Sequence, residues 1–227
     1  MKTVWYLLWC MLSVGWSADL FVFAPNFAKP NLVEKEIGAK VPSASVKAFG
    51  RFNDFKAMVA SAKPALLIAP AETVRSLGLE DHIRLRGVLK GLTSEALMLV
   101  SLNKPINLNE LTGKTIGIVA TVERTDLKLM LESELKSKPK LNAVTKLEDL
   151  IPMLTFQSAE AVLVTSSQAE EFKKRSQANL VAQLIADSRH DNLVVVLIAD
   201  DGHAGLAEIE KLPGNVLDLL NVEGWKK

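Results

Sequence analysis

Cysteine is nearly absent from this 227-residue chain, since the single Cys10 lies within the first 18 residues. Removal of that segment would exclude disulfides, thiolate catalysis and cysteine-ligated metals. Aromatic residues are also scarce, because the same segment holds the only tyrosine and three of the four tryptophans. A carbohydrate ligand is therefore disfavoured, because the apolar faces of sugars are usually bound against aromatic rings.

An excess of charge of one sign is lacking as well. The chain has 27 Lys and Arg against 26 Asp and Glu, and loss of Lys2 with the N-terminal segment leaves 26 of each. Such a balance gives no electrostatic reason to expect nucleic acid or an anionic membrane as a partner.

The chain has no apolar run of the ~20 residues that a transmembrane helix requires. At the N-terminus, Lys2 precedes an apolar run from Val4 to Val14, and the small residues Gly15 and Ser17 follow. That layout is typical of a secretory signal peptide. We therefore expect a signal peptide at residues 1–17 and a mature chain that is exported to the periplasm without insertion into the membrane.

The rest of the sequence alternates short, β-branched apolar runs with segments of helical period. This alternation predicts an α/β fold in which mostly parallel sheets are covered by helices. Strands are expected at residues 19–26, 43–49, 64–70, 94–101, 115–120, 141–144, 159–165, 179–185 and 192–199.

The frame Leu-x-Gly-Lys-Thr-Ile-Gly-Ile at Leu111 to Ile118 lies between two long apolar strands, 94–101 and 192–199. This arrangement resembles the type II periplasmic solute-binding proteins of ABC importers, and the short length and strand order are most similar to the phosphate, phosphite and phosphonate type. The resemblance implies two lobes joined by these two strands, which would cross between them. The implied boundaries are residues 18–97 and 195–227 for lobe one and residues 98–194 for lobe two.

Ligands of open α/β sheets bind outside the carboxyl ends of the strands. By this rule, the candidate ligand-binding residues are those that follow expected strands in both implied lobes. They are Asn26, Phe27, Arg51, Glu72 and Thr73 in lobe one, and Thr121, Arg124, Thr125, Thr165 and Ser166 in lobe two.

A helix expected from Arg124 would present free backbone N–H groups, which with the helix dipole bind an anion. The alternative is that Thr121 caps this helix while Glu123 and Asp126 stabilise its positive end. Those two carboxylates would compete with an anionic solute. An anionic or zwitterionic solute is expected, and an amine-bearing or neutral solute stays open beside it.

Neither a metal nor a cofactor is expected. The three histidines, His82, His190 and His203, are far apart in the sequence, and isolated histidines are more often surface residues. The run Asp200-Asp201-Gly202 before His203 offers hard ligands, but its composition favours a turn.

The sequence lacks the G-x-S-x-G, H-E-x-x-H and Gly-rich nucleotide-binding motifs. We therefore expect a non-enzymatic binding protein that captures a small solute for an ABC permease or a membrane sensor protein. A second hypothesis is an enzyme on the same fold, with Glu72 facing Arg124 across a cleft. A third is an exported accessory that binds a protein partner and has lost or altered its solute pocket.

Overall fold

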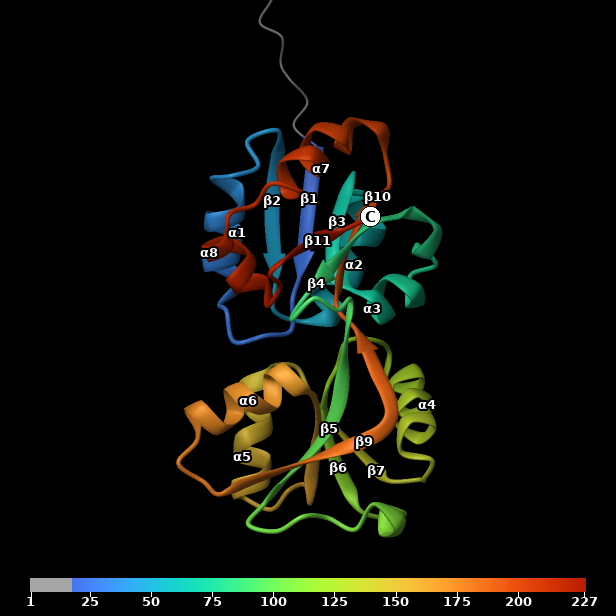
Figure 1. The fold of residues 1–227 in the computed structure, drawn as a ribbon. Coiled ribbons are helices and arrows are strands. Elements are labelled where there is room, and N and C mark those ends of the chain that lie inside the picture. Colours follow the sequence, from blue (N-terminus) through green and yellow to red (C-terminus); the bar gives the residue numbers. More distant parts are fainter. Residues whose placement is uncertain (1–17) are drawn as a thin grey trace, which may run out of the picture.

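The computed structural model describes residues 18–227. The expected signal peptide, residues 1–17, lies outside the described residues. The described chain forms two lobes, each built on a mixed β-sheet with helices on its faces (Figure 1). The predicted α/β architecture with two lobes is therefore confirmed.

The sheet of lobe one has six strands in the order β11-β4-β10-β3-β1-β2. Strand β1 pairs in parallel with β2 and β3, while β10 lies antiparallel between β3 and β4, and β11 is antiparallel to β4. Four of its six strands thus run in one direction. The strands are β1 (Ala18–Phe23), β2 (Ala44–Phe49), β3 (Leu66–Pro70), β4 (Ile83–Val88), β10 (Leu193–Leu197) and β11 (Gly224–Lys226).

The sheet of lobe two has five strands in the order β7-β6-β8-β5-β9. Strand β6 pairs in parallel with β7 and β8, and β5 is antiparallel to its neighbours β8 and β9. In this sheet, therefore, β5 alone runs against the others. The strands are β5 (Ser94–Leu102), β6 (Thr115–Val119), β7 (Lys140–Val144), β8 (Ala161–Thr165) and β9 (Leu180–Asp191).

Helices cover the sheets in both lobes (Figure 1). Lobe one carries α1 (Pro30–Gly38), α2 (Phe52–Ala62), α3 (Ala71–Ser76), α7 (His203–Ile209) and α8 (Gly214–Leu217). Lobe two carries α4 (Arg124–Leu135), α5 (Leu150–Thr155) and α6 (Ser166–Arg175). Single 3₁₀ turns are η1 (Glu80–His82), η2 (Leu108–Glu110), η3 (Leu147–Asp149), η4 (Asp200–Gly202) and η5 (Asp218–Leu220).

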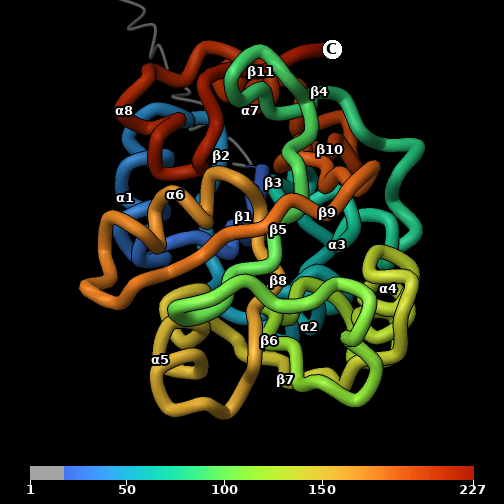
Figure 2. The backbone as a smooth tube through the Cα atoms, turned by 60° about the horizontal axis from the view of Figure 1, so that its bottom comes forward, coloured from blue at the N-terminus to red at the C-terminus, as the bar shows by residue number. Residues whose placement is uncertain are grey.

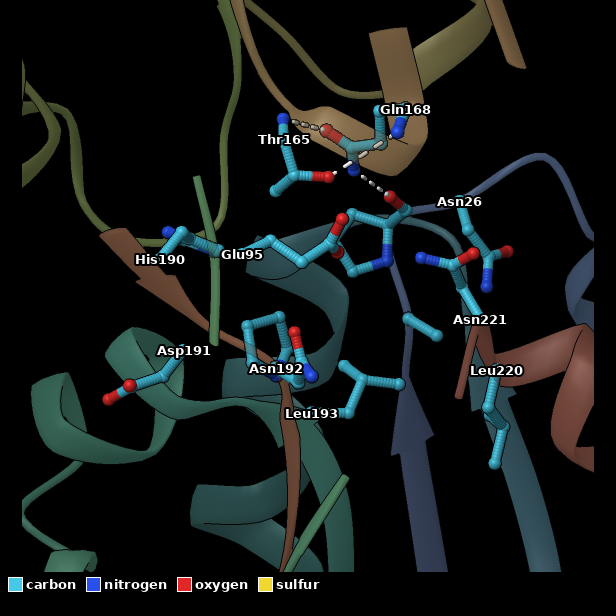
Figure 3. A pocket seen from close by; sticks show the side chains of 13 residues that line it. Asn26, Glu95, Thr165, Gln168, His190, Asp191, Asn192, Leu193, Leu220 and Asn221 are labelled. Atoms are coloured by element: carbon cyan, nitrogen blue, oxygen red, sulfur yellow. Dashed lines mark hydrogen bonds between the residues drawn. The ribbon is translucent and has the colours of Figure 1, made fainter. Parts of the chain in front are cut away.

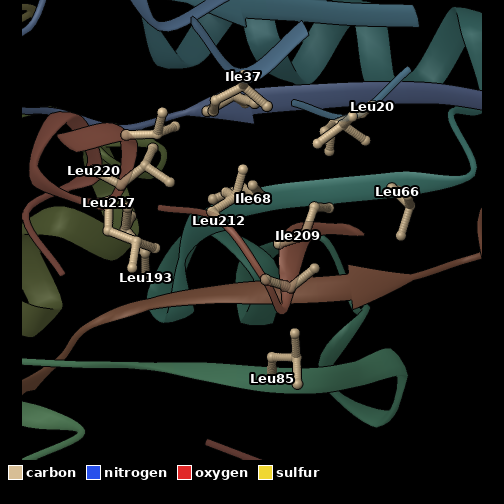
Figure 4. Close-up of a cluster of buried hydrophobic side chains, with 14 of the residues drawn as sticks. Leu20, Ile37, Leu66, Ile68, Leu85, Leu193, Ile209, Leu212, Leu217 and Leu220 are labelled. Atoms are coloured by element: carbon tan, nitrogen blue, oxygen red, sulfur yellow. The ribbon is translucent and has the colours of Figure 1, made fainter. Parts of the chain in front are cut away.

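The core of lobe one occupies both faces of its sheet, because successive side chains of a strand point to opposite faces. Leu20 and Val22 of β1 pack on one face with Ile37 of α1 and with residues of the C-terminal helices (Figure 4). Phe21 and Phe23 of the same strand pack on the other face, against the α2 side. A continuous apolar run such as that of β1 is expected for a strand covered on both faces.

The chain passes from the first sheet to the second between β4 and β5, and it returns at Asn192 between β9 and β10. Figure 2 shows β5 and β9 side by side at the middle of the molecule. The crossing segments are therefore β5 and the end of β9, whereas β10 belongs wholly to the sheet of lobe one. From this division we propose lobe boundaries nine and two residues earlier than the sequence implies, with lobe one at 18–88 and 193–227.

Asn192 connects the two crossing segments through hydrogen bonds. Its buried side-chain amide donates to the carbonyl oxygens of Gly87 and Leu92, both at 3.0 Å, and its backbone N–H donates to Thr93 at 2.9 Å. These three bonds tie the return crossing to the outward one. The asparagine thus fixes the place at which the lobes are joined.

Strand β9 contains a wide bulge close to this junction. Ala96 of β5 pairs with Arg189 and Met98 pairs with Leu184, so residues 185–188 lie opposite the single residue Leu97. Within the bulge the backbone of Asp187 has a φ of 61°. Bulges of this kind bend a strand and increase its twist, and here the bend lies where β9 leaves the sheet of lobe two.

Candidate functional site

A small cavity lies between the lobes, where the crossing strands meet the ends of β1, β3 and β8. Its volume is about 60 Å³. Both lobes and both crossing strands contribute to its wall, as the carboxyl-end rule for α/β sheets predicts. The side chains that surround it in Figure 3 include Asn26, Glu95, Thr165, Gln168, His190, Asp191, Asn192, Leu193, Leu220 and Asn221.

A second cavity of about 50 Å³ adjoins the first. The two share Pro25, Thr165, Gln168 and His190 in their walls. The second is more apolar, since Leu97, Ile118, Val119, Met130, Leu163 and Val164 line it together with Glu72 and Thr121. These two cavities are thus a polar chamber beside an apolar one.

Direct contacts between the lobes close the cleft around these cavities. The buried Thr73 hydroxyl on α3 donates to the carbonyl oxygen of Thr121 at 2.7 Å. The Gln168 side-chain amide of α6 donates to the carbonyl oxygen of Pro25 at 3.4 Å. The two lobes therefore contact each other directly across the cleft in this structure.

Phe27 of lobe one contributes an apolar contact to the closure. Its ring packs edge to face on Phe172 of α6, with ring centroids 5.7 Å apart. The Arg175 guanidinium lies 4.3 Å from the centroid of the same ring. Aromatic pairs and cation–π contacts of this geometry are attractive beyond their buried area, so Phe27 holds the loop after β1 against lobe two.

His190 and Glu72 form an ion pair across the junction of the lobes. The His190 Nε2 atom lies 3.3 Å from Glu72 Oε1, and the two side chains are only 24% and 12% exposed. Burial by itself lowers the pKa of His190, but the contact with Glu72 and the nearby Asp191 and Glu95 outweigh burial and raise this pKa to about 9. Burial likewise raises the pKa of Glu72, and the charge of His190 outweighs it, so the pKa of Glu72 is lowered.

The Glu72–His190 contact is an ion pair without a well-aligned hydrogen bond, because the buried Oε1 of Glu72 has no hydrogen-bond partner in the described structure. The 3.3 Å separation supports the charge attraction, which depends less on alignment than a hydrogen bond does. Glu72 therefore keeps an acceptor site on the cavity wall.

Glu95 faces the cavity from the start of β5 (Figure 3). It is the cross-strand partner of His190 in the β5–β9 pairing. Its Oε2 atom accepts two hydrogen bonds from the first turn of α6, one from the Ser167 backbone N–H at 2.8 Å and one from the Ser166 hydroxyl at 3.1 Å. The positive end of the α6 dipole stabilises this carboxylate.

The start of α6 is also capped by its own residues. The Thr165 hydroxyl accepts from the backbone N–H of Gln168 at 3.4 Å, and the Gln168 side-chain oxygen accepts from the Thr165 N–H at 3.0 Å. This reciprocal pair is a capping box. The Thr-x-x-Gln spacing was a sequence signal for Gln168, which the strand-end rule alone does not select.

Seven of the ten candidate residues lie at the interface between the lobes. Asn26 and Thr165 line the first cavity, and Glu72, Thr121 and Thr165 line the second. The remaining three contact residues across the cleft or beside it: Phe27 contacts α6, Thr73 bonds Thr121, and Ser166 bonds Glu95.

Arg51, Arg124 and Thr125 are exposed and line neither cavity. The Arg124 guanidinium donates to the carbonyl oxygen of Leu141 within lobe two at 3.3 Å. The predicted Glu72–Arg124 pair is therefore wrong, because His190 occupies the position opposite Glu72. The helix itself begins at Arg124 as predicted, but Thr121 does not cap it, since Glu123 is at the N-cap and makes no side-chain capping bond.

His190 was expected at the surface with the other histidines, and this expectation is wrong. The sequence offers no local signal for its pairing, because Glu72 and Glu95 are more than ninety residues away from it. Among residues 18–227, no group of three His, Cys, Asp or Glu side chains is placed to hold a metal ion. In the same range, no helix is both long and apolar enough to cross a bilayer.

Comparison with known proteins gives evidence at the level of the fold. Neither a scan of protein-family models nor a search of curated proteins finds a match. Among solved structures, the chain is similar to the amino acid ABC transporter substrate-binding protein AbpA from Streptococcus pneumoniae bound to L-arginine. The TM-score is 0.61 at 16% identity, over 90% of this chain and 93% of that one.

Two further solved structures have similar scores. A putative L-cystine ABC transporter protein from Listeria monocytogenes matches with a TM-score of 0.59 at 15% identity, over 92% of this chain and 98% of that one. The GluR0 ligand-binding core from Nostoc punctiforme in complex with L-glutamate matches with a TM-score of 0.59 at 13% identity, over 89% and 96%. The chain therefore has the two-lobe periplasmic binding protein fold.

Proposed function

We propose that this chain is an exported, non-enzymatic binding protein that closes its two lobes over a small polar solute. The observation that carries the proposal is the cavity lined from both lobes and both crossing strands. Contacts from both sides give a solute more binding energy in the closed arrangement than in an open one, so binding shifts the population towards closure. Its proposed location is the periplasm.

The proposed protein partner that recognises the closed state is an ABC permease or a membrane sensor protein. Two solved neighbours are named as parts of ABC transporters, and another is the VFT2 domain of Bordetella pertussis BvgS, with a TM-score of 0.56. The names of the first two support an ABC permease as the partner. The crossing strands couple the lobes, so closure changes the surface that either partner would contact.

The structure and its neighbours favour fewer classes of solute than the sequence leaves open. A phosphate, phosphonate or other anionic solute has less support, because Glu95 already accepts hydrogen bonds from the first turn of α6 and Glu123 precedes α4. The neighbours bound to L-arginine and L-glutamate carry amino acids instead. A zwitterionic or amine-bearing solute is therefore the better candidate for this cleft.

Thermal denaturation of the purified protein with amino acids, amines, phosphate and phosphonates tests the proposal. A ligand that binds only the folded state stabilises it by about 2.7 kcal/mol at a concentration 100 times its Kd. We expect one class to raise the melting temperature. A24L, which adds a larger side chain to the wall of the first cavity, should abolish that shift, whereas A57L on the exposed surface of α2 should preserve it.

A second candidate function is that of an accessory protein whose closed lobes bind a protein partner without a solute. The small cavities of about 60 and 50 Å³ and the direct Thr73–Thr121 bond favour it, because both lobes already contact each other. A melting temperature that no solute class changes would contradict the first proposal and support this one.

A further inference from the structure

The charges on the cavity walls are mainly negative. Glu95 and Asp191 line the first cavity and Glu72 lines the second. Among residues 18–227, His190 is the only basic side chain in either wall. The charge of His190 is paired with Glu72 at 3.3 Å, so it does not compensate the other carboxylates fully.

The two remaining carboxylates differ in their surroundings. Asp191 has a partner at the rim, because its Oδ2 atom lies 3.7 Å from the Arg75 guanidinium. Glu95 has no ion-pair partner within 4 Å among the described residues. Of the three carboxylates on the cavity walls, Glu95 is therefore the one without an ion-pair partner.

The hydrogen bonds of Glu95 also leave it able to accept more. Both bonds from α6 end on Oε2, although an ionised carboxylate has about four lone-pair sites on its two oxygens. On the adjoining wall, Oε1 of Glu72 is buried and has no hydrogen-bond partner. A buried acceptor without a donor is rare in folded proteins, so Oε1 of Glu72 and the remaining lone pairs of Glu95 together match a group that carries several donors.

We propose that the cleft binds the ammonium end of a small aliphatic amine and that Glu95 is the carboxylate that receives it. This inference rests on the proposed solute-binding function and names the chemical class of the solute. An ammonium group carries three N–H donors and one positive charge. It matches both the unpaired charge of Glu95 and the free acceptor sites of the two walls.

The same walls discriminate against a carboxylate on the solute. The first turn of α6, where a solute carboxylate would find backbone donors, already binds Glu95. No lysine or arginine among the described residues lines either cavity. The one cation in the walls, His190, is already paired with Glu72, and a buried carboxylate without a cation of its own is strongly destabilised. An amine without a carboxylate should therefore bind more tightly than an amino acid of similar size.

The dimensions of the chamber limit the solute to a few heavy atoms. A cavity needs about 10–15 Å³ on this measure for one water molecule, so about 60 Å³ holds only a few atoms of that size. The apolar walls of the second cavity, such as Leu97, Ile118 and Leu163, suit a short hydrocarbon tail. A propyl chain is the test ligand that these dimensions suggest.

Isothermal titration of the purified protein with n-propylamine, propionate and alanine tests the inference. We expect measurable binding of n-propylamine, no binding of propionate, and alanine at least about tenfold weaker than the amine, since charge-assisted bonds differ by that order. E95Q should weaken n-propylamine about tenfold or more by removing the charge. E160Q is the matched control, because Glu160 also accepts a backbone N–H, from Thr115, but lies outside both cavities.

Propyltrimethylammonium provides a test that needs no variant, because it keeps the positive charge and lacks N–H donors. We expect it to bind the unmodified protein more weakly than n-propylamine does. This comparison tests the inference even if E95Q fails to fold. Tighter binding of propionate or alanine than of n-propylamine would overturn the amine class while the solute-binding function stands. Equal affinity of a folded E95Q would overturn the role of Glu95, and no binding of any solute class would contradict the proposed function as well.

Discussion

The hydroxyl of Thr73 donates a buried hydrogen bond across the cleft to the carbonyl oxygen of Thr121, at 2.7 Å. Thr73 is fully buried, so T73V removes the donor with little change of shape and leaves a buried carbonyl oxygen without it. We expect the free energy of unfolding in urea to fall by about 1–3 kcal/mol. A loss below 0.5 kcal/mol would mean that the lobes are not held together by this bond.

A matched comparison is another short contact between the lobes, from Lys56 to Glu123 at 2.6 Å. Both of its side chains are about half exposed, at 45% and 51%. Exposed ion pairs contribute about 0–1 kcal/mol. K56M should therefore change the free energy of unfolding by less than T73V does, despite the similar distance.

The His190–Glu72 pair predicts a pH dependence of stability. The pKa of folded His190 is about 9, against an ordinary value of 6.5, so its contribution is complete below pH 6.5 and is lost as the pH rises through 9. The lowered pKa of Glu72 adds a contribution that is present above its ordinary value of 4.5 and lost as the pH falls through its folded pKa. We expect the pair to contribute most to stability between pH 4.5 and pH 6.5, where both contributions are complete.

Urea unfolding at several pH values from 6 to 10 measures this dependence. H190Q should remove most of the decline between pH 6.5 and 9. H203Q is the control, because His203 is 66% exposed. An unchanged decline in H190Q would assign the titration to groups outside the His190–Glu72 pair.

Asp187 in the β9 bulge has a φ of 61°, which lies in the left-handed region of backbone conformation. That region costs an L-residue about 1–2 kcal/mol relative to glycine. D187G should leave the free energy of unfolding unchanged or raise it, because glycine adopts this backbone freely. D187V should lower it by about 1 kcal/mol or more relative to D187G. Equal stability of the two variants would show that the bulge rearranges.

Gly87 in β4 lies where neighbouring atoms leave no room for a side chain. A Cβ there would lie 2.6 Å from Val222 Cγ1 and 2.9 Å from the carbonyl oxygen of Leu193. G87A should therefore destabilise the protein by about 1–3 kcal/mol in thermal or urea unfolding. G214A, whose Cβ would have no atom within 4 Å, should be close to neutral, and a similar loss in both would contradict the packing argument.

The sequence predicted most of the regular elements because their signals are local. The helix from Arg124 carries Leu127, Leu131 and Leu135 on its buried face, and the apolar run of β8 is buried throughout. Strand β4 was missed because its charged residues, Arg84 and Arg86, interrupt the apolar pattern. The three-residue β11 forms only through its pairing with β4, which no local pattern reveals.

The site was predictable only where it follows strand ends. Thr165 was found in this way, because a buried strand ends directly at it. Glu95 and His190 were not, because they face each other through the register of β5 and β9. Side chains directly opposite each other across antiparallel strands lie on the same face, but this register depends on a bulge and on strands about eighty residues apart.

The position of β10 has a consequence for biosynthesis. It lies between β3 and β4 in the middle of its sheet, yet it is made only after the whole of the second lobe. Until then, the edges of β3 and β4 that pair with β10 have no partner. Exposed strand edges of this kind favour aggregation. A nascent chain truncated before Leu193 should therefore need a holding chaperone, and completion of the first lobe should be the slow step of maturation because the pairing of β10 with β3 spans over a hundred residues.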